Sequence, residues 1–155
     1  MRKSVIFLLV YFFWAAGQNL DLLVRHQIKS DYFIFQNSGV VPLFFIFVVI
    51  IFILNITTIY SLYTRFHLGF YAALSSLMIG AVFSCISMFM VLRDIPGVRD
   101  AYRKGREIRG LTIREEALDM IFTEKGMYYT LGVVLLVKAI VLFFVLRNRK
   151  HFTIR

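Results

Sequence analysis

Residues 40–63 read VVPLFFIFVVIIFILNITTIYSLY, an apolar run that contains no charged residue. The hydrocarbon core of a bilayer is about 30 Å thick, and a helix that rises about 1.5 Å per residue crosses it in about 20 residues. Residues 68–92 and 127–146 form two further runs of sufficient length. Within lipid, each backbone N–H and C=O must be satisfied inside its own segment, as in a helix. The three runs therefore predict transmembrane α-helices.

A fourth span is predicted at residues 4–24, which begin with SVIFLLVYFFWAA and stay largely apolar to their end. Arg2 and Lys3 before this run, and the small residues up to Gly17, also resemble a secretory signal peptide. Cleavage after Gly17 would leave three spans. We favour a retained span, because the run is long enough to cross the bilayer and Trp14 followed by Ala, Ala and Gly is a mediocre cleavage site. Asp21 would then lie near the end of the span, with Arg25 as its (i, i+4) partner.

The composition agrees with a membrane protein. Of the 155 residues, 59% are hydrophobic, compared with about 45–50% in an average soluble domain. The net charge is +9, and the basic residues lie at segment ends and in one loop, where anionic lipid headgroups would meet them. We therefore expect the lipid bilayer as a partner and do not expect nucleic acid. The single cysteine, Cys85, allows neither an internal disulfide nor a thiolate zinc site.

The polar segment at residues 93–126 separates the third and fourth spans and carries helix signals. Pro96 suits the first turn of a helix, and Gly110 suits the position just after its end. Thr112 and Glu115 have the spacing of a capping box, which predicts a second helix from Thr112. We expect an amphipathic helical hairpin and favour a solvated connector whose apolar side rests on the bundle. The alternatives are that its basic face binds anionic lipid headgroups or that the hairpin docks a partner protein.

Four polar side chains inside the spans are predicted to lie at one depth. Lys138 is eight residues before Leu146, about 12 Å along the axis, and so beyond the reach of a snorkelling side chain. Asn55 lies equally far from the corresponding end of its span. Ser75 and Ser76 lie at the same level in the antiparallel third span. Because ionisable groups at this depth usually face other helices or water, these residues predict a buried polar layer.

A stripe of small residues recurs every four positions in the third span: Ala72, Ser76, Gly80 and Ser84. Such a stripe lets helix backbones approach closely, so Ser76 is expected to face neighbouring helices. Three uses of the polar layer stay open. It could be packing alone, a transport or ligand site, or a place where Lys138 meets a carboxylate of a partner subunit.

No catalytic, cofactor-binding or metal-binding residues are predicted. Among the nine acids only Asp21 lies within a proposed span, so no intramembrane carboxylate pair forms. His26, His67 and His151 lie at segment edges without the spacing of metal ligands.

The expected fold is all-α: a polytopic membrane protein with one domain over residues 1–155, a four-helix transmembrane bundle with the hairpin between spans 3 and 4. The count of Lys and Arg, seven on the side of the termini and ten on the other, would place the long loop in the cytoplasm. We nevertheless favour cytoplasmic termini, in a plasma or bacterial inner membrane, because basic residues directly precede the first span and directly follow the last. The favoured function is a non-enzymatic accessory or structural subunit that contacts a partner membrane protein or a second copy of itself. The alternative is a small oligomeric transporter or channel around Lys138.

Overall fold

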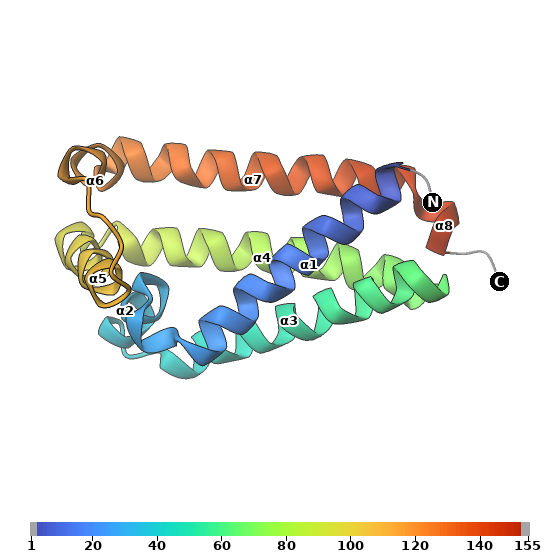
Figure 1. The fold of residues 1–155 in the computed structure, drawn as a ribbon, viewed down its shortest axis with the longest axis horizontal. Helices are drawn as coiled ribbons and strands as arrows, with labels where there is room; N and C mark the ends of the chain where they lie inside the picture. Colours follow the sequence, from blue (N-terminus) through green and yellow to red (C-terminus); the bar gives the residue numbers. More distant parts are fainter. Residues whose placement is uncertain (1–2, 153–155) are drawn as a thin grey trace.

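The computed structural model describes residues 3–152, which fold into helices joined by short turns (Figure 1). Four helices are long and apolar enough to cross a membrane: α1 (Lys3–Val24), α3 (Val41–Thr64), α4 (Leu68–Val91) and α7 (Glu124–Arg147). The shorter elements are η1 (His26–Ile28), α2 (Ser30–Asn37), α5 (Ile95–Ile108), α6 (Glu115–Ile121) and α8 (Arg149–Phe152). The prediction of an all-α chain with four helices of membrane-spanning length is confirmed. Arg2, which supports the expected orientation, lies outside the described residues.

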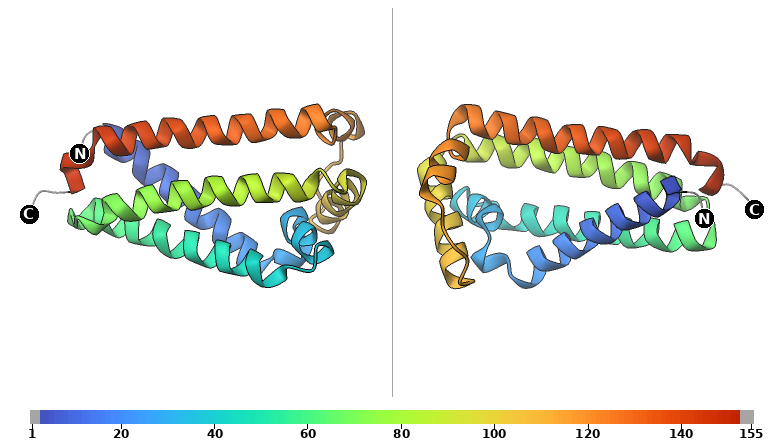
Figure 2. Two further views of the ribbon diagram at one scale, coloured as in Figure 1. Left: turned by 180° about the vertical axis from the view of Figure 1, so that it is seen from behind. Right: turned by 45° about the horizontal axis from the view of Figure 1, so that its top comes forward.

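The long helices are not packed equally. Helices α3 and α4 form an antiparallel pair, α1 crosses them diagonally, and α7 runs beside α4 (Figures 1 and 2). Helix α1 meets α7 near its own beginning, where the Ser4 hydroxyl donates to Asn148 Oδ1 at 2.9 Å and the rings of Phe7 and Phe144 lie 4.9 Å apart. From there α1 and α7 diverge toward α5 and α6 (Figure 1).

Two apolar cores hold the bundle, one toward each end. The first, near the described termini, includes Phe12 of α1, Phe70 of α4 and Val145 of α7. The second, at the opposite end, includes Phe35 of α2 and Phe44 of α3. The buried polar side chains of Asn55 and Ser76 lie between the two cores, so polar groups interrupt the interior of the bundle near its middle.

The connection between α1 and α3 contains helical structure that the sequence analysis did not anticipate. Helix α2 places Ile34 and Phe35 in the second core, and the Phe35 ring stacks on Phe83 of α4 at 5.5 Å. With only eight residues, α2 is too short for its periodicity to identify it. Its packing against the bundle stabilises it instead.

The start of the second hairpin helix was predicted wrongly. Helix α6 begins at Glu115 rather than at Thr112, and no side chain caps its first turn. The Arg106 guanidinium of α5 donates to the carbonyl of Thr112 at 2.8 and 3.2 Å, which keeps this residue outside the helix. The predicted end of the first helix is confirmed, because Gly110 follows α5 with φ +65°.

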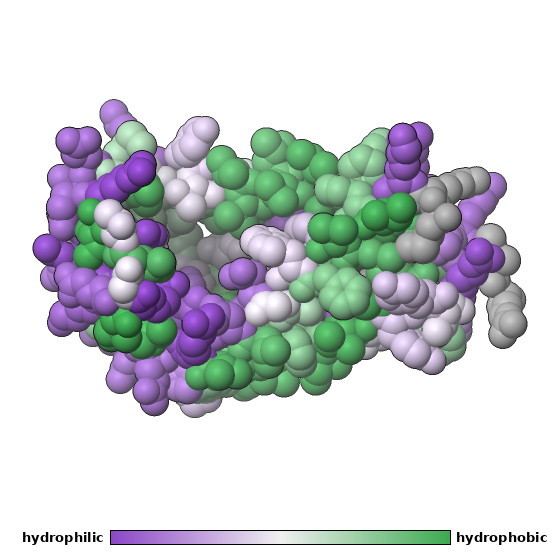
Figure 3. Space-filling model, in the orientation of Figure 1, coloured by the Kyte–Doolittle hydropathy of each residue, from purple (hydrophilic) through white to green (hydrophobic). Residues whose placement is uncertain are grey.

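Helix α7 begins three residues earlier than the span predicted at residues 127–146. Thr123 caps it, and its hydroxyl accepts a hydrogen bond from the Gly126 N–H at 3.0 Å. Helices α5 and α6 lie across one end of the bundle (Figure 2). Figure 3 shows hydrophobic residues over much of the middle of the molecule and hydrophilic residues at both ends, which suggests a membrane location.

Candidate functional site: a lateral pocket around Lys138

A cavity of about 280 Å³ lies between the four long helices, in the middle of the bundle. We call it the lateral pocket. Its lining includes Gln18 and Asn19 of α1, Asn55 of α3, Ser76 and Gly80 of α4, and Lys138 of α7. Figure 3 shows a hollow between α1 and α7, with hydrophilic residues beside it. The pocket lining also includes residues of α1 and α7, so the pocket lies between the same two helices, on the side of the bundle.

The Lys138 ammonium rests directly on the backbone of α4. A Cβ atom at Gly80 would lie only 2.6 Å from Lys138 Nζ, so the lysine occupies space that any other residue at position 80 would fill. Within residues 3–152, Lys138 makes no ion pair and no hydrogen bond. A cation at membrane depth usually pairs with an acid or a carbonyl, so its charge lacks a counterpart in this part of the chain.

Asn55 adds a second unused donor to the same pocket. Its side chain is buried, with 1% exposed, and its Oδ1 accepts a hydrogen bond from the Ser76 hydroxyl. This bond directs the amide so that Nδ2 is the free end, and Nδ2 has no hydrogen-bond partner. A buried donor without a partner costs about 1–3 kcal/mol. The unpaired amide lies buried beside the pocket, and Lys138 is a donor that lines it.

The structure brings together three of the four residues expected in the polar layer. Asn55, Ser76 and Lys138 line the lateral pocket, whereas Ser75 is half-buried and does not line it. Ser75 lies about 100° around α4 from Ser76, on a side of the helix that the pocket does not reach.

The small-residue stripe lies where α4 meets both α3 and α7. Ser76 faces Asn55 of α3, and Gly80 faces Lys138 of α7. Ala72 is also buried, while Ser84 is half-buried and donates to the Gly80 carbonyl at 2.8 Å. Within the stripe, Gly80 is thus the residue against which the Lys138 side chain packs.

Helix α1 contributes residues that the sequence analysis missed. Tyr11, Trp14, Gln18 and Asn19 all line the lateral pocket. The adjacent amides Gln18 and Asn19, inside an otherwise apolar run, were the available signal. These amides line the same pocket as Lys138 because α1 crosses the bundle diagonally, and no local sequence pattern predicts that path.

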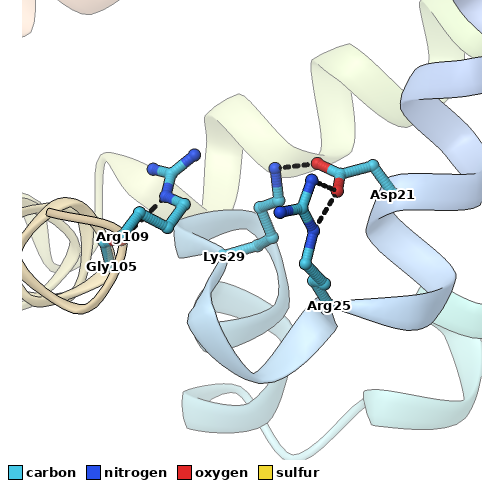
Figure 4. Close-up of polar contacts among 5 residues, drawn as sticks. All are labelled: Asp21, Arg25, Lys29, Gly105 and Arg109. Carbon is cyan, nitrogen blue, oxygen red and sulfur yellow. Dashed lines mark hydrogen bonds and ion pairs between the residues drawn. The ribbon is translucent and has the colours of Figure 1, made fainter. Parts of the chain in front are cut away.

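A separate polar cluster lies at the end of α1 and does not neutralise Lys138. The Asp21 carboxylate pairs with Arg25, as expected, and also with Lys29 (Figure 4). Close by, a Cβ atom at Gly105 of α5 would lie 2.3 Å from the Ile28 carbonyl oxygen, so η1 packs tightly on α5. The cluster therefore helps to position the α2–α5 end of the bundle.

A second cavity, of about 290 Å³, adjoins the lateral pocket toward α5 and α6. We call it the cap cavity. Phe83, Ser84 and Val134 line both spaces, so the two are neighbours. The rest of the cap-cavity lining is mainly apolar and comes from α2, α4, α5, α6 and α7.

Comparisons with protein-family models, with curated proteins and with solved structures find no match to this chain.

Proposed function

We propose that this protein is a non-enzymatic accessory membrane protein that holds an anionic group of another molecule in its lateral pocket. One observation carries the proposal: Lys138 lacks a counter-charge within residues 3–152 and lies in the same pocket as the free donor of Asn55. A charge at this depth is costly unless it is paired. An anionic group that enters the pocket would neutralise Lys138 beside the unpaired amide of Asn55.

A small transporter or channel, acting as an oligomer, is the second candidate. It is favoured by the contiguity of the two cavities, which share Phe83, Ser84 and Val134. Together they lead from the middle of the bundle toward α5 and α6. In this alternative the polar layer would line part of a path for a solute.

The proposal includes a location and a set of partners. The bilayer, in a plasma or bacterial inner membrane, surrounds the apolar helices, and both termini face the cytoplasm. The partner is another membrane component or a second copy of this chain, and nucleic acid has no role. The lateral opening supports such a partner, because a molecule within the bilayer can reach Lys138 without crossing the polar ends.

Native mass spectrometry of the protein purified in mild detergent tests the proposal. We expect the wild type to retain an anionic molecule, either a chain or a small ligand, that Lys138→Met loses. Lys125→Met is the matched control, because Lys125 lies on α7 outside the lateral pocket. The same bound molecules in all three proteins would contradict the proposal. Solute flux in liposomes that depends on Lys138, without a retained ligand, would favour the transporter.

A further inference from the structure

We propose that the lateral pocket and the cap cavity together bind a single-chain amphiphile with a carboxylate head. The head would lie at Lys138 and Asn55, and the hydrocarbon tail would fill the cap cavity. This inference rests on the proposed function, because it names the molecule that brings the anionic group.

The head group follows from the charge at the pocket. Lys138 lines the pocket and its Nζ offers hydrogens, while Asn55 Nδ2 lies buried beside the pocket without a partner and Asn55 Oδ1 is already engaged by Ser76. One ammonium group matches one negative charge, and a carboxylate is the simplest head that carries it. A phosphate monoester carries about −1.5 to −2 at neutral pH and would need further cations. Hence a carboxylate fits the single charge of this pocket.

The tail follows from the direction and lining of the adjoining cavity. Beyond the shared residues, apolar side chains such as Ile34, Val91 and Leu131 continue the lining. Met127 lines the far end of the cap cavity, eleven residues before Lys138 on the same helix, or about 16 Å along its axis. An extended chain zigzags, so C–C bonds of about 1.5 Å advance it by about 1.3 Å each, and about 13 to 14 carbons span that distance.

The entry route between α1 and α7 also suits an amphiphile. Helices α1 and α7 diverge, and the hollow between them opens on the face of the molecule where apolar residues are abundant (Figure 3). An amphiphile dissolved in the bilayer could enter sideways and keep its tail in apolar surroundings throughout. An acidic side chain of a partner helix would fill the lateral pocket alone and leave the cap cavity unused.

The head-group test compares two probes with the same tail. Binding of palmitate and of hexadecanol is measured by displacement of a fluorescent fatty acid from the protein in phosphatidylcholine nanodiscs. We expect palmitate to bind at least tenfold more tightly to the wild type, and Lys138→Met to abolish this difference. Asn55→Asp would place a competing carboxylate in the pocket and should also weaken palmitate binding, whereas Lys125→Met should leave it unchanged.

The tail test uses chain length. Leu131→Trp narrows the cap cavity at a residue that does not line the lateral pocket. We expect it to weaken palmitate binding at least tenfold and to leave octanoate binding unchanged. Leu136→Trp is the matched control, because Leu136 lies on α7 outside both cavities and is 61% exposed.

The outcomes separate the amphiphile from the proposed function. If the anionic molecule retained through Lys138 is a protein chain and Leu131→Trp affects neither probe, the amphiphile is excluded while the proposed function stands. Equal binding of palmitate and hexadecanol to the wild type would also overturn the amphiphile. If Lys138→Met alters neither probe binding nor the retained molecules, both proposals fail.

Discussion

At the scale of single residues, glycines determine where the helices can approach one another. A Cβ atom at Gly69 of α4 would lie 2.0 Å from the Ser61 Cβ of α3, so the two helices meet closely there. Gly132 of α7 is a natural contrast, because a Cβ atom there would meet nothing within 4 Å. Gly69 was not part of the predicted stripe, yet its contact is tighter than that of Gly80.

Gly69→Ala is therefore expected to destabilise the bundle by about 1–3 kcal/mol, because the added methyl group overpacks the contact with Ser61. Gly132→Ala should have the opposite effect, a gain of up to about 1 kcal/mol from helix propensity. Unfolding by SDS from mixed micelles measures both. Equal stability of the two variants would contradict the close α3–α4 contact.

The second prediction at this scale concerns Asp31, which lines the cap cavity. Burial raises the pKa of its carboxyl above the ordinary value of 3.8, while Lys29 partly opposes the shift. The folded state therefore binds the proton more tightly than the unfolded state does. The stability that Asp31 contributes is fully present below about pH 3.8 and is lost as pH rises through the higher, folded pKa.

We expect Asp31→Asn to remove this pH dependence and to slow hydrogen exchange in α2 at neutral pH, relative to the wild type. The measurement is hydrogen exchange of the α2 amides across the acidic range. If α2 in the wild type became more stable as pH rose, the predicted direction of the pKa shift would be wrong.

At the scale of elements, ion pairs join the two hairpin helices. Arg99 of α5 contacts Asp119 at 2.6 Å and Glu115 at 3.3 Å, and Arg103 contacts Glu115 at 3.1 Å. Part of the basic face of α5 is thus paired with acids of α6. This arrangement favours a structural role for these arginines, while Lys104 of α5 is exposed to solvent and could meet lipid headgroups.

Glu115→Gln removes the acceptor that Arg99 and Arg103 share. Because all three side chains are partly exposed, the expected loss is at most about 1 kcal/mol and should shrink at high salt. Faster hydrogen exchange in α6 of Glu115→Gln than in the wild type, measured at low ionic strength, would show this loss of stability. Glu116→Gln is the control, since the described structure shows no ion pair at Glu116. Equal exchange in the two variants would mean that the pairs do not hold α6.

At the scale of the whole molecule, the order of the helices places the described chain ends and the hairpin at opposite ends of the bundle. Both ends of the described chain lie at one end of the bundle, and the hairpin lies at the other (Figure 1). With cytoplasmic termini, position 111 in the hairpin faces outward and position 3 faces inward. An impermeant maleimide applied to intact cells should therefore label Leu111→Cys and not Lys3→Cys, in a Cys85→Ser background.

After permeabilisation both cysteines should react, which controls for their accessibility. Labelling of Lys3→Cys alone in intact cells would reverse the proposed orientation and leave the helix arrangement intact. Labelling of both, or of neither, would contradict the placement of the hairpin and the termini at opposite faces.

The sequence by itself determined the four long apolar helices, the end of α5 just before Gly110 and the similar distances of Asn55, Ser76 and Lys138 from their helix ends. These features follow from local quantities: the length of an apolar run, a glycine after a helix, and a fixed rise per residue. The position of a residue within an apolar run specifies how far along the helix it lies. It does not specify which neighbour that residue faces.

Only the tertiary structure decided the faces of the helices. It places Ser75 outside the lateral pocket, brings Gln18 and Asn19 into it and adds α2 to the second core. It also overrides the capping box at Thr112, through a hydrogen bond from the side chain of Arg106 in the preceding helix. The physical reason is common to all of these: a helix that is apolar on every side has no preferred face in lipid, so contacts between helices choose one.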